Sequence, residues 1–300
     1  MTEIAQSTRS TASAQRPTVS MIVTTLGRGA PITLLLRTLA VQTHLPLEVI
    51  FVDQNETAAM VGDAIAGEWP FDVRHIHAPG VRGASRGRNH GLPAVRGDIL
   101  IFPDDDCWYP ADFVAKSVAI LEGGYDFACG RAADENGRSI NGRFETEAME
   151  VTHGVVWTTS IEWMQVVRTS AFRALGGFDE DIGIGAHTPW RACEAQELVF
   201  RLIQNGYRGF YSPDLIGHHE ELDTEEPDLP MRRKMRSYGR GMGFVLGMHD
   251  RHPATAAFWI ARSTAGACLA FAKLRFARAL MLFHVTLGRI EGRIGKSFTP

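Results

Sequence analysis

Three consecutive carboxylates, Asp104, Asp105 and Asp106, close the apolar run DILIFPDDD (98–106). The apolar residues before them have the composition of a buried strand, so the carboxylates arrive where that strand ends. Carboxylates packed this closely repel one another and raise one another's pKa unless a cation neutralises them. Oxygen ligands of this kind suit Mg²⁺ or Mn²⁺, and such ions commonly hold phosphate groups. The alternative is a solvated acidic loop that caps the next helix.

Other polar side chains follow strand patterns earlier in the chain. Thr24 and Thr25 end the run VSMIVTT (19–25), and Asp53 ends LEVIFVD (47–53). Ligands of parallel α/β sheets bind beyond the carboxyl ends of the strands. We therefore expect these three side chains and the acidic run to share one edge of a sheet.

Apolar patterning defines the elements that would position these groups. Strand patterns alternate with helix patterns, which is typical of an α/β fold with a mostly parallel sheet flanked by helices. The less regular stretch 131–190 is expected to form mixed strands and loops over the mouth of a site. The predicted strands are 19–25, 47–53, 73–78, 99–102 and 126–130. One predicted helix begins at Pro31, and two others cover about 111–121 and 194–205.

Composition narrows the class of protein. The chain has 300 residues, of which 45% are hydrophobic and 22% charged, so it is long enough for a sizeable core. Its net charge of −3 gives no signal for nucleic acid binding. The four cysteines are scattered without zinc spacing, which fits a reducing cytoplasm. Residues 1–17 lack the apolar core of a secretion signal, and we expect a disordered tail there.

The segment 231–300 differs from the rest of the chain. It opens with the basic run RRKMR (232–236) and continues as a long apolar stretch interrupted by Arg and Lys. A spanning helix over 254–272 would place Arg262 in hydrocarbon, which is costly. We predict helices that lie on a membrane surface, with their basic side chains reaching anionic headgroups. The alternative is amphipathic helices that pack on the preceding domain or in a dimer.

Seven segments share their motifs with one enzyme family: the strand ending in Thr24-Thr25, VDQN (52–55), GASRGRNHGL (83–92), FPDDDCWYP (102–110), GGFDE (176–180), TPW…CEAQEL…RL (188–202) and HH (218–219). Over about residues 18–247 the chain resembles the family 2 glycosyltransferases. The resemblance implies a GT-A type, Rossmann-like sheet with a C-terminal helical appendage (231–300). It also implies a nucleotide-sugar-binding half (18–130) and an acceptor-binding half (131–230).

The resemblance implies an inverting, metal-dependent transferase. The enzyme would move a sugar from a nucleotide-diphosphate sugar to a glycan or polyprenyl-linked acceptor. Together with the basic C-terminal segment, this predicts a cytoplasmic protein that is peripheral on the inner face of the plasma membrane. The residues implied to bind the nucleotide sugar, with Asp53 hydrogen-bonding the base, are Thr24, Thr25, Asp53, Arg88, Asp104 and Asp105.

The same resemblance assigns the metal site. Asp104 and Asp106 are the outer pair of a DxD motif, with Asp106 contacting Mn²⁺ or Mg²⁺ and Asp104 nearer the ribose or a metal-bound water. His218 or His219 would complete the ligand shell. Arg88 would contact the diphosphate or brace the acidic cluster, because charge-assisted bonds to phosphate favour arginine.

Inverting transfer requires a base that takes the proton of the acceptor hydroxyl. The family carries Glu-Asp-x-x-Leu at the start of an acceptor-side helix, where this chain has Glu194, Ala195 and, two residues later, Glu197. Glu194 is the first candidate for the base and Glu197 the second. Both are also acids that a helix N-terminus favours. Trp190 would stack on the acceptor sugar or belong to the core.

Two other functions fit parts of the pattern. A nucleotidyltransferase-like enzyme of sugar nucleotides is also α/β with an acidic metal site. Such enzymes usually have a Gly-rich activating loop near the N-terminus, and this chain matches that loop only weakly. A catalytically inactive scaffold that binds a sugar nucleotide at a membrane would explain Ala195 in place of the expected acid. Phosphate-loop and dinucleotide signatures are absent from the sequence, which disfavours phosphoryl transfer and dinucleotide redox chemistry.

Overall fold

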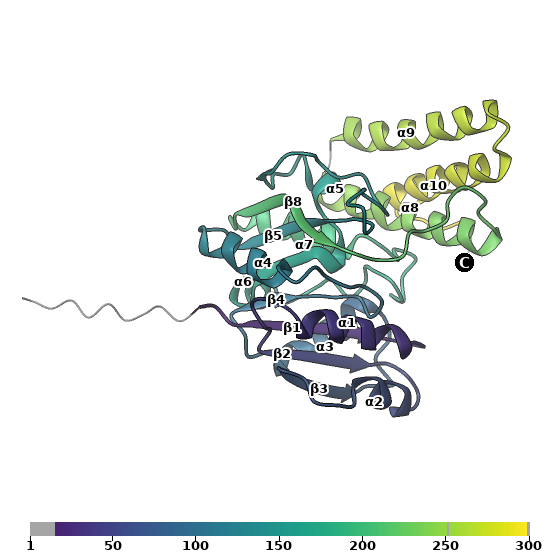
Figure 1. The fold of residues 1–300 in the computed structure, drawn as a ribbon. Coiled ribbons are helices and arrows are strands. Elements are labelled where there is room, and N and C mark those ends of the chain that lie inside the picture. The colour runs from purple at the N-terminus through teal and green to yellow at the C-terminus, as the bar shows by residue number, and fades with distance from the viewer. Residues whose placement is uncertain (1–15, 251, 299–300) are drawn as a thin grey trace, which may run out of the picture.

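The computed structural model describes residues 16–250 and 252–298, in which eight strands form a mixed sheet (Figure 1). The strand order is β3-β2-β1-β4-β7-β5-β8-β6. Most of the predicted tail, residues 1–15, lies outside the described residues. The strands are β1 (Val19–Thr25), β2 (Glu48–Asp53), β3 (Asp72–His77), β4 (Ile99–Ile101), β5 (Phe127–Ala132), β6 (Met149–Glu150), β7 (Gln165–Arg168) and β8 (Gly209–Gly217).

Strands β1 to β4 form the parallel part of the sheet, as the sequence predicted. Strand β2 is buried along its whole length, which explains its nearly continuous apolar sequence. Its first residue, Glu48, is fully buried and accepts hydrogen bonds from Ser20 and Arg96. The ends of β1 and β4 meet in a bridge between Thr24 and Asp104. The acidic run therefore lies at the carboxyl edge of the sheet, where the sequence placed it.

Helices cover both faces of this sheet. One core cluster packs α1, α2 and α4 against the sheet, and a second core cluster on the opposite face includes α6 and α7. Helix α3 packs on β1 and β2 through Gly91, where a Cβ atom would lie 3.0 Å from both Ile22 and Val52. The helices are α1 (Ala30–Ala40), α2 (Ala59–Ile65), α3 (Ala84–Gly91), α4 (Phe113–Glu122), α5 (Val156–Thr159), α6 (Thr169–Ala174) and α7 (Glu194–Gln204), with short 3₁₀ turns η1 (Leu92–Ala94) and η2 (Glu162–Met164).

Strand β7 joins the parallel part of the sheet to the rest. It pairs antiparallel with β4 on one side and with β5 on the other. On its other side, strand β5 pairs in parallel with β8. The boundary predicted at residue 130 falls inside β5, so the two predicted halves share one sheet.

Three helices close the chain: α8 (Leu229–His249), α9 (Pro253–Ala272) and α10 (Phe276–Ile294). Helix α8 packs closely on α10, because glycines replace side chains where the two backbones meet. A Cβ atom on Gly239 would lie 2.5 Å from the carbonyl oxygen of Val285, and one on Gly288 would lie 2.1 Å from that of Arg236. Across this contact the buried Glu291 accepts hydrogen bonds from Arg236 and Arg240.

Helices α9 and α10 lie far from β2 and β3, at the opposite end of the molecule (Figure 1). None of the described helices combines the length and apolarity needed to cross a membrane. Several large apolar side chains of this region are exposed, including Phe271 at 63% and Leu274 at 73%. Monomeric proteins rarely expose such side chains in groups, so this surface needs an explanation.

Candidate active site

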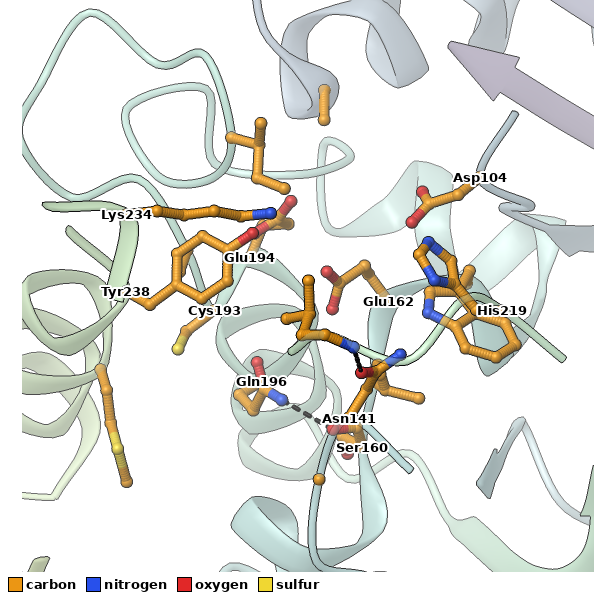
Figure 2. Close-up of a pocket in the computed structure, with 18 of the residues that line it drawn as sticks. Asp104, Asn141, Ser160, Glu162, Cys193, Glu194, Gln196, His219, Lys234 and Tyr238 are labelled. Atoms are coloured by element: carbon orange, nitrogen blue, oxygen red, sulfur yellow. Dashed lines mark hydrogen bonds between the residues drawn. The ribbon is translucent and has the colours of Figure 1, made fainter. Parts of the chain in front are cut away.

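A cavity of about 560 Å³ opens at the carboxyl edge of the sheet. The ends of β1 and β4 supply its floor, with Thr24 and the three aspartates. Segments from the start of α3, from η2, from the start of α7 and from α8 complete the wall, with Glu162, Glu194 and Tyr238 among the lining residues. Figure 2 shows Asp104 and His219 on one side of this cavity and Lys234 and Tyr238 of α8 on the other.

Two arginines neutralise part of the acidic cluster. Arg28 pairs with both Asp105 and Asp106, and the Arg28–Asp105 distance is 2.9 Å. Arg88 donates a hydrogen bond of 2.9 Å to Asp104. Burial raises the pKa of Asp104 to about 7 even though Arg88 opposes the shift, and the charges of Glu162 and Asp106 add to the rise. Two arginines therefore face three carboxylates, and burial favours the protonated form of one of them, Asp104.

Asp104, Asp106 and His219 form a group that could hold a metal ion. One ligand atom from each residue lies within 4.8 Å of the others. His219 Nε2 is 3.1 Å from Asp106. Burial alone would lower the pKa of His219, but its hydrogen bond and charge interaction with Asp106 raise that pKa to about 9. Carboxylate oxygens suit Mn²⁺ or Mg²⁺, and a proton on His219 would have to leave for its imidazole to bind a cation.

The adjacent His218 takes a different role. Its Nδ1 lies 2.9 Å from the carbonyl oxygen of Ala133, and its ring stacks on Trp108 with centroids 5.8 Å apart. It is not part of the three-residue group that could hold a cation. Of the two predicted histidines, the structure brings only His219 to the aspartates, because successive side chains of an extended segment point to opposite sides.

Arg88 lies between Asp104 and the first base candidate, Glu194. Its side chain is 1% exposed, and its Nη1 lies 3.7 Å from Glu194 Oε1. Both oxygens of Glu194 are sealed from solvent and have no hydrogen-bond partner among the described residues. Burial raises the pKa of Glu194, while Arg88 opposes the rise. Glu194 thus lines the cavity, but its carboxylate oxygens are buried and directed at Arg88.

Glu162 is the site residue that the sequence reasoning missed. It lies in η2, and its carboxylate points into the cavity between Glu194 and the pair Asp104 and His219 (Figure 2). Burial raises its pKa, and the charge of Glu194 raises it further. A lone acid inside the apolar run SIEWMQVV (160–167) was the available signal.

The second base candidate, Glu197, lies away from the cavity. It is 1% exposed and does not line the cavity. Its carboxylate pairs with Arg201 at 2.7 Å and with His249 at 3.2 Å, on the side of α7 that faces α8. These partners hold the pKa of Glu197 below its usual value although burial opposes this. Ala195, where the family has an acid, is fully buried.

Trp190 is buried in the second core cluster. It is 8% exposed, it lies outside the residues that line the cavity, and its ring stacks on Phe244 with centroids 4.5 Å apart and an interplanar angle of 5°. Phe244 therefore covers the face that a sugar would need. This position fits the alternative role in the core, and a contact with an acceptor sugar stays a prediction.

Two predicted nucleotide contacts lie beside the cavity. Asp53 is fully buried, accepts hydrogen bonds from the backbone and side chain of Asn55, and pairs with His75. Its neighbour Gln54 lines the cavity instead. Thr25 is 1% exposed and its hydroxyl donates to the carbonyl oxygen of Arg28. Direct contacts of Asp53 or Thr25 with a nucleotide stay predictions.

Comparison with known proteins places the chain in a family. The profile described as "Glycosyl transferase family 2" matches residues 20–171. A pre-mycofactocin glycosyltransferase of Mycobacterium tuberculosis is 28% identical over 222 residues, which cover 69% of this chain and 43% of that protein. An uncharacterized glycosyltransferase of Haemophilus influenzae is 36% identical over 104 residues, or 35% of this chain. The chain thus spans less than half the length of these curated relatives.

Solved structures share the fold across nearly the whole chain. The mannosyltransferase PcManGT from Pyrobaculum calidifontis, in complex with GDP-Man and Mn²⁺, matches with a TM-score of 0.63 at 16% identity and covers 95% of this chain and 89% of its own. S. aureus TarS 1–349 in complex with UDP-GlcNAc matches with a TM-score of 0.54 at 18% identity, covering 94% and 93%. The predicted GT-A fold is confirmed, and the chain belongs to glycosyl transferase family 2.

Proposed function

We propose that the chain is a metal-dependent, inverting glycosyltransferase that uses a nucleotide-diphosphate sugar. The observation that carries the proposal is the group Asp104, Asp106 and His219 at the carboxyl edge of the sheet, inside a cavity that Glu162 and Glu194 also line. PcManGT, which shares the fold, was solved with GDP-Man and Mn²⁺. That complex supports a nucleotide-diphosphate sugar as the donor and a divalent cation at the aspartates.

The donor side of the cavity would bind the nucleotide diphosphate. When bound at Asp106, Asp104 and His219, a divalent cation supplies charge that stabilises the leaving nucleotide. Arg88 holds Asp104 in place, because it donates to that carboxylate from a buried position. Arg28 has a side chain that is 49% exposed, so it is free to turn from the aspartates to a phosphate.

The acceptor side needs a base, and Glu162 fits that role better than Glu194. The Glu162 carboxylate reaches the cavity, whereas both Glu194 oxygens are sealed against Arg88. Burial moves the pKa of Glu162 upward, toward the working pH, which favours proton transfer to a base. In this assignment Glu162 supplies the carboxylate that Ala195 does not, and Glu194 positions Arg88.

A screen of UDP-, GDP- and dTDP-sugars by thermal shift tests the donor class. One of these donors should raise the melting temperature with Mn²⁺ and much less with EDTA, because a ligand that binds only the folded state stabilises it. At 100 times its dissociation constant, the gain is about 2.7 kcal/mol, or roughly 5 °C or more for a chain of this size. A shift by nucleoside triphosphates alone would favour a nucleotidyltransferase, and a shift without sugar transfer would favour an inactive scaffold.

The exposed surface of α9 and α10 supports peripheral attachment to an anionic membrane on the cytoplasmic side, which fits a polyprenyl-linked acceptor. Arg262, Lys273 and Arg275 are exposed near its exposed apolar side chains. The basic side chains would contact anionic headgroups, and the apolar side chains would contact acyl chains.

Flotation with anionic liposomes checks this attachment. The full chain should float, and a Phe271→Ser, Leu274→Ser double variant should float much less, because those side chains are exposed and their loss leaves the core intact. The control is Val41→Ser, which removes a side chain that is 64% exposed at the end of α1. If the full chain and both variants stay in the soluble fraction, this surface contacts another protein copy or partner instead.

A further inference from the structure

A second cavity, of about 1330 Å³, lies beside the reaction cavity between the start of α8, the end of α10 and the loop 184–191. We call it the basic groove. Its lining contains five guanidinium or ammonium groups and no carboxylate. They are Arg191, Arg233, Lys234, Arg236 and Arg240.

The charges of the basic groove are poorly balanced. The buried Glu291 pairs with Arg236 and Arg240. Among the described residues, no carboxylate pairs with Arg191, Arg233 or Lys234. Arg191 has one weak contact, from its Nε to the carbonyl oxygen of Thr188 at 3.4 Å. Clustered cations of this kind attract anions, and guanidinium groups match phosphate oxygens in geometry and charge.

The position of the basic groove indicates which reactant it would serve. It shares Ile184, Gly185, Lys234 and Tyr238 with the reaction cavity. In Figure 2, Lys234 and Tyr238 lie on the side opposite Asp104 and His219, with Glu162 and Glu194 between them. A donor diphosphate held at the aspartates would therefore lie across the cavity from the basic groove. An anion in the groove would belong to the molecule that approaches from the acceptor side.

We propose that the basic groove binds a phosphate or diphosphate group of the acceptor, with Arg191, Arg233 and Lys234 as its principal contacts. This rests on the proposed transferase function and specifies its acceptor as a phosphate-bearing molecule. The groove would anchor the phosphate while the acceptor hydroxyl reaches Glu162. Its volume exceeds that of a single phosphate, which leaves room for the part of the acceptor that joins phosphate to hydroxyl.

The direct test is binding of inorganic pyrophosphate to the full chain in EDTA, where no cation can hold the probe at the aspartates. The test variant is Arg191→Gln, Arg233→Gln, since both side chains are exposed and neither lines the reaction cavity. We expect about a tenfold loss of pyrophosphate affinity for each arginine removed, because charge-assisted hydrogen bonds to phosphate are lost. The control is Arg16→Gln, Arg37→Gln, which removes the same charge from exposed positions outside both cavities and should bind as the wild type does.

Donor binding and transfer are measured on the same variants. The groove variant should keep its Mn²⁺-dependent thermal shift with the donor nucleotide and should show a raised KM for a phosphate-bearing acceptor. If no nucleotide sugar binds the wild type, the proposed function fails independently of the pyrophosphate result. If the groove variant binds pyrophosphate as tightly as the wild type, the groove proposal is overturned.

Lipid headgroups are a second source of phosphate. Vesicles of an anionic phospholipid distinguish them from an acceptor phosphate. If the groove variant loses flotation while its binding of soluble pyrophosphate is unchanged, the groove contacts the membrane and the assignment to an acceptor is wrong. If pyrophosphate binding falls and flotation persists, the assignment stands.

Discussion

Replacing Asp106 with asparagine is expected to abolish sugar transfer and the Mn²⁺-dependent part of nucleotide binding. Asn keeps the size of the side chain but loses the charge that Asp106 offers beside His219 and Asp104. A bound cation contributes several kcal/mol to the stabilisation of charge in the transition state, so kcat should fall about 10³-fold or more. Folding should survive, because the change relieves repulsion among three carboxylates and Arg28 keeps Asp105 as a partner.

The measurements for Asp106→Asn are steady-state transfer and thermal shift with nucleotide, each with and without Mn²⁺. Asp112→Asn is the control, since Asp112 lies outside the cavity and pairs with Lys116 on the surface. Undiminished transfer by Asp106→Asn would mean that the DxD assignment is wrong.

Glu162→Gln is expected to lower kcat by about 10²–10⁴-fold, the range that a general base contributes. Donor binding should be unchanged, because Glu162 is not among the proposed metal and nucleotide contacts and lies between Asp104 and Glu194 (Figure 2). In the wild type the rate should rise with pH as Glu162 loses its proton, and burial places this rise above the ordinary glutamate value of 4.5. This acid limb should disappear in Glu162→Gln.

Glu194→Gln should behave differently. It leaves the buried Arg88 without one of its two carboxylate partners, and breaking a buried pair costs on the order of 3 kcal/mol. We therefore expect a lower melting temperature and weaker metal binding, with a smaller loss of kcat at saturating Mn²⁺. Should Glu194→Gln lose turnover with its stability intact while Glu162→Gln stays active, the two roles are reversed. Glu197→Gln is a useful control, because it disturbs the same helix away from the cavity.

The sequence predicted the position of the acidic cluster better than that of the other carboxylates around the cavity. Asp104, Asp105 and Asp106 follow an apolar strand, and parallel strands bring their carboxyl ends together, so local pattern and topology give the same answer. The choice between His218 and His219 depends on which side of an extended segment faces the aspartates. That direction follows from the bridge between Trp108 and His218, which local sequence does not reveal.

The acceptor side depends on contacts between segments far apart in the chain. Glu162 reaches the cavity because η2 packs against the start of α7, where Gln165 donates to the carbonyl oxygen of Ala195. A motif search over α7 finds Glu194 and Glu197 but has no access to this contact. The basic groove is also formed by distant segments, since Arg191 and Arg233 come from different elements.

Strand β7 has a consequence for how the chain can be made and divided. In the described sheet it pairs with both β4 and β5, although it follows β5 in sequence. During synthesis, the edges of β4 and β5 therefore remain unpaired until the ribosome has released residues 165–168. Open strand edges are templates for aggregation, so a nascent chain halted before β7 is at risk. A fragment that ends near residue 130 would carry the same open edges permanently. Because the other edge of β5 pairs with β8, the smallest unit that leaves neither β4 nor β5 with an open edge must extend past β8.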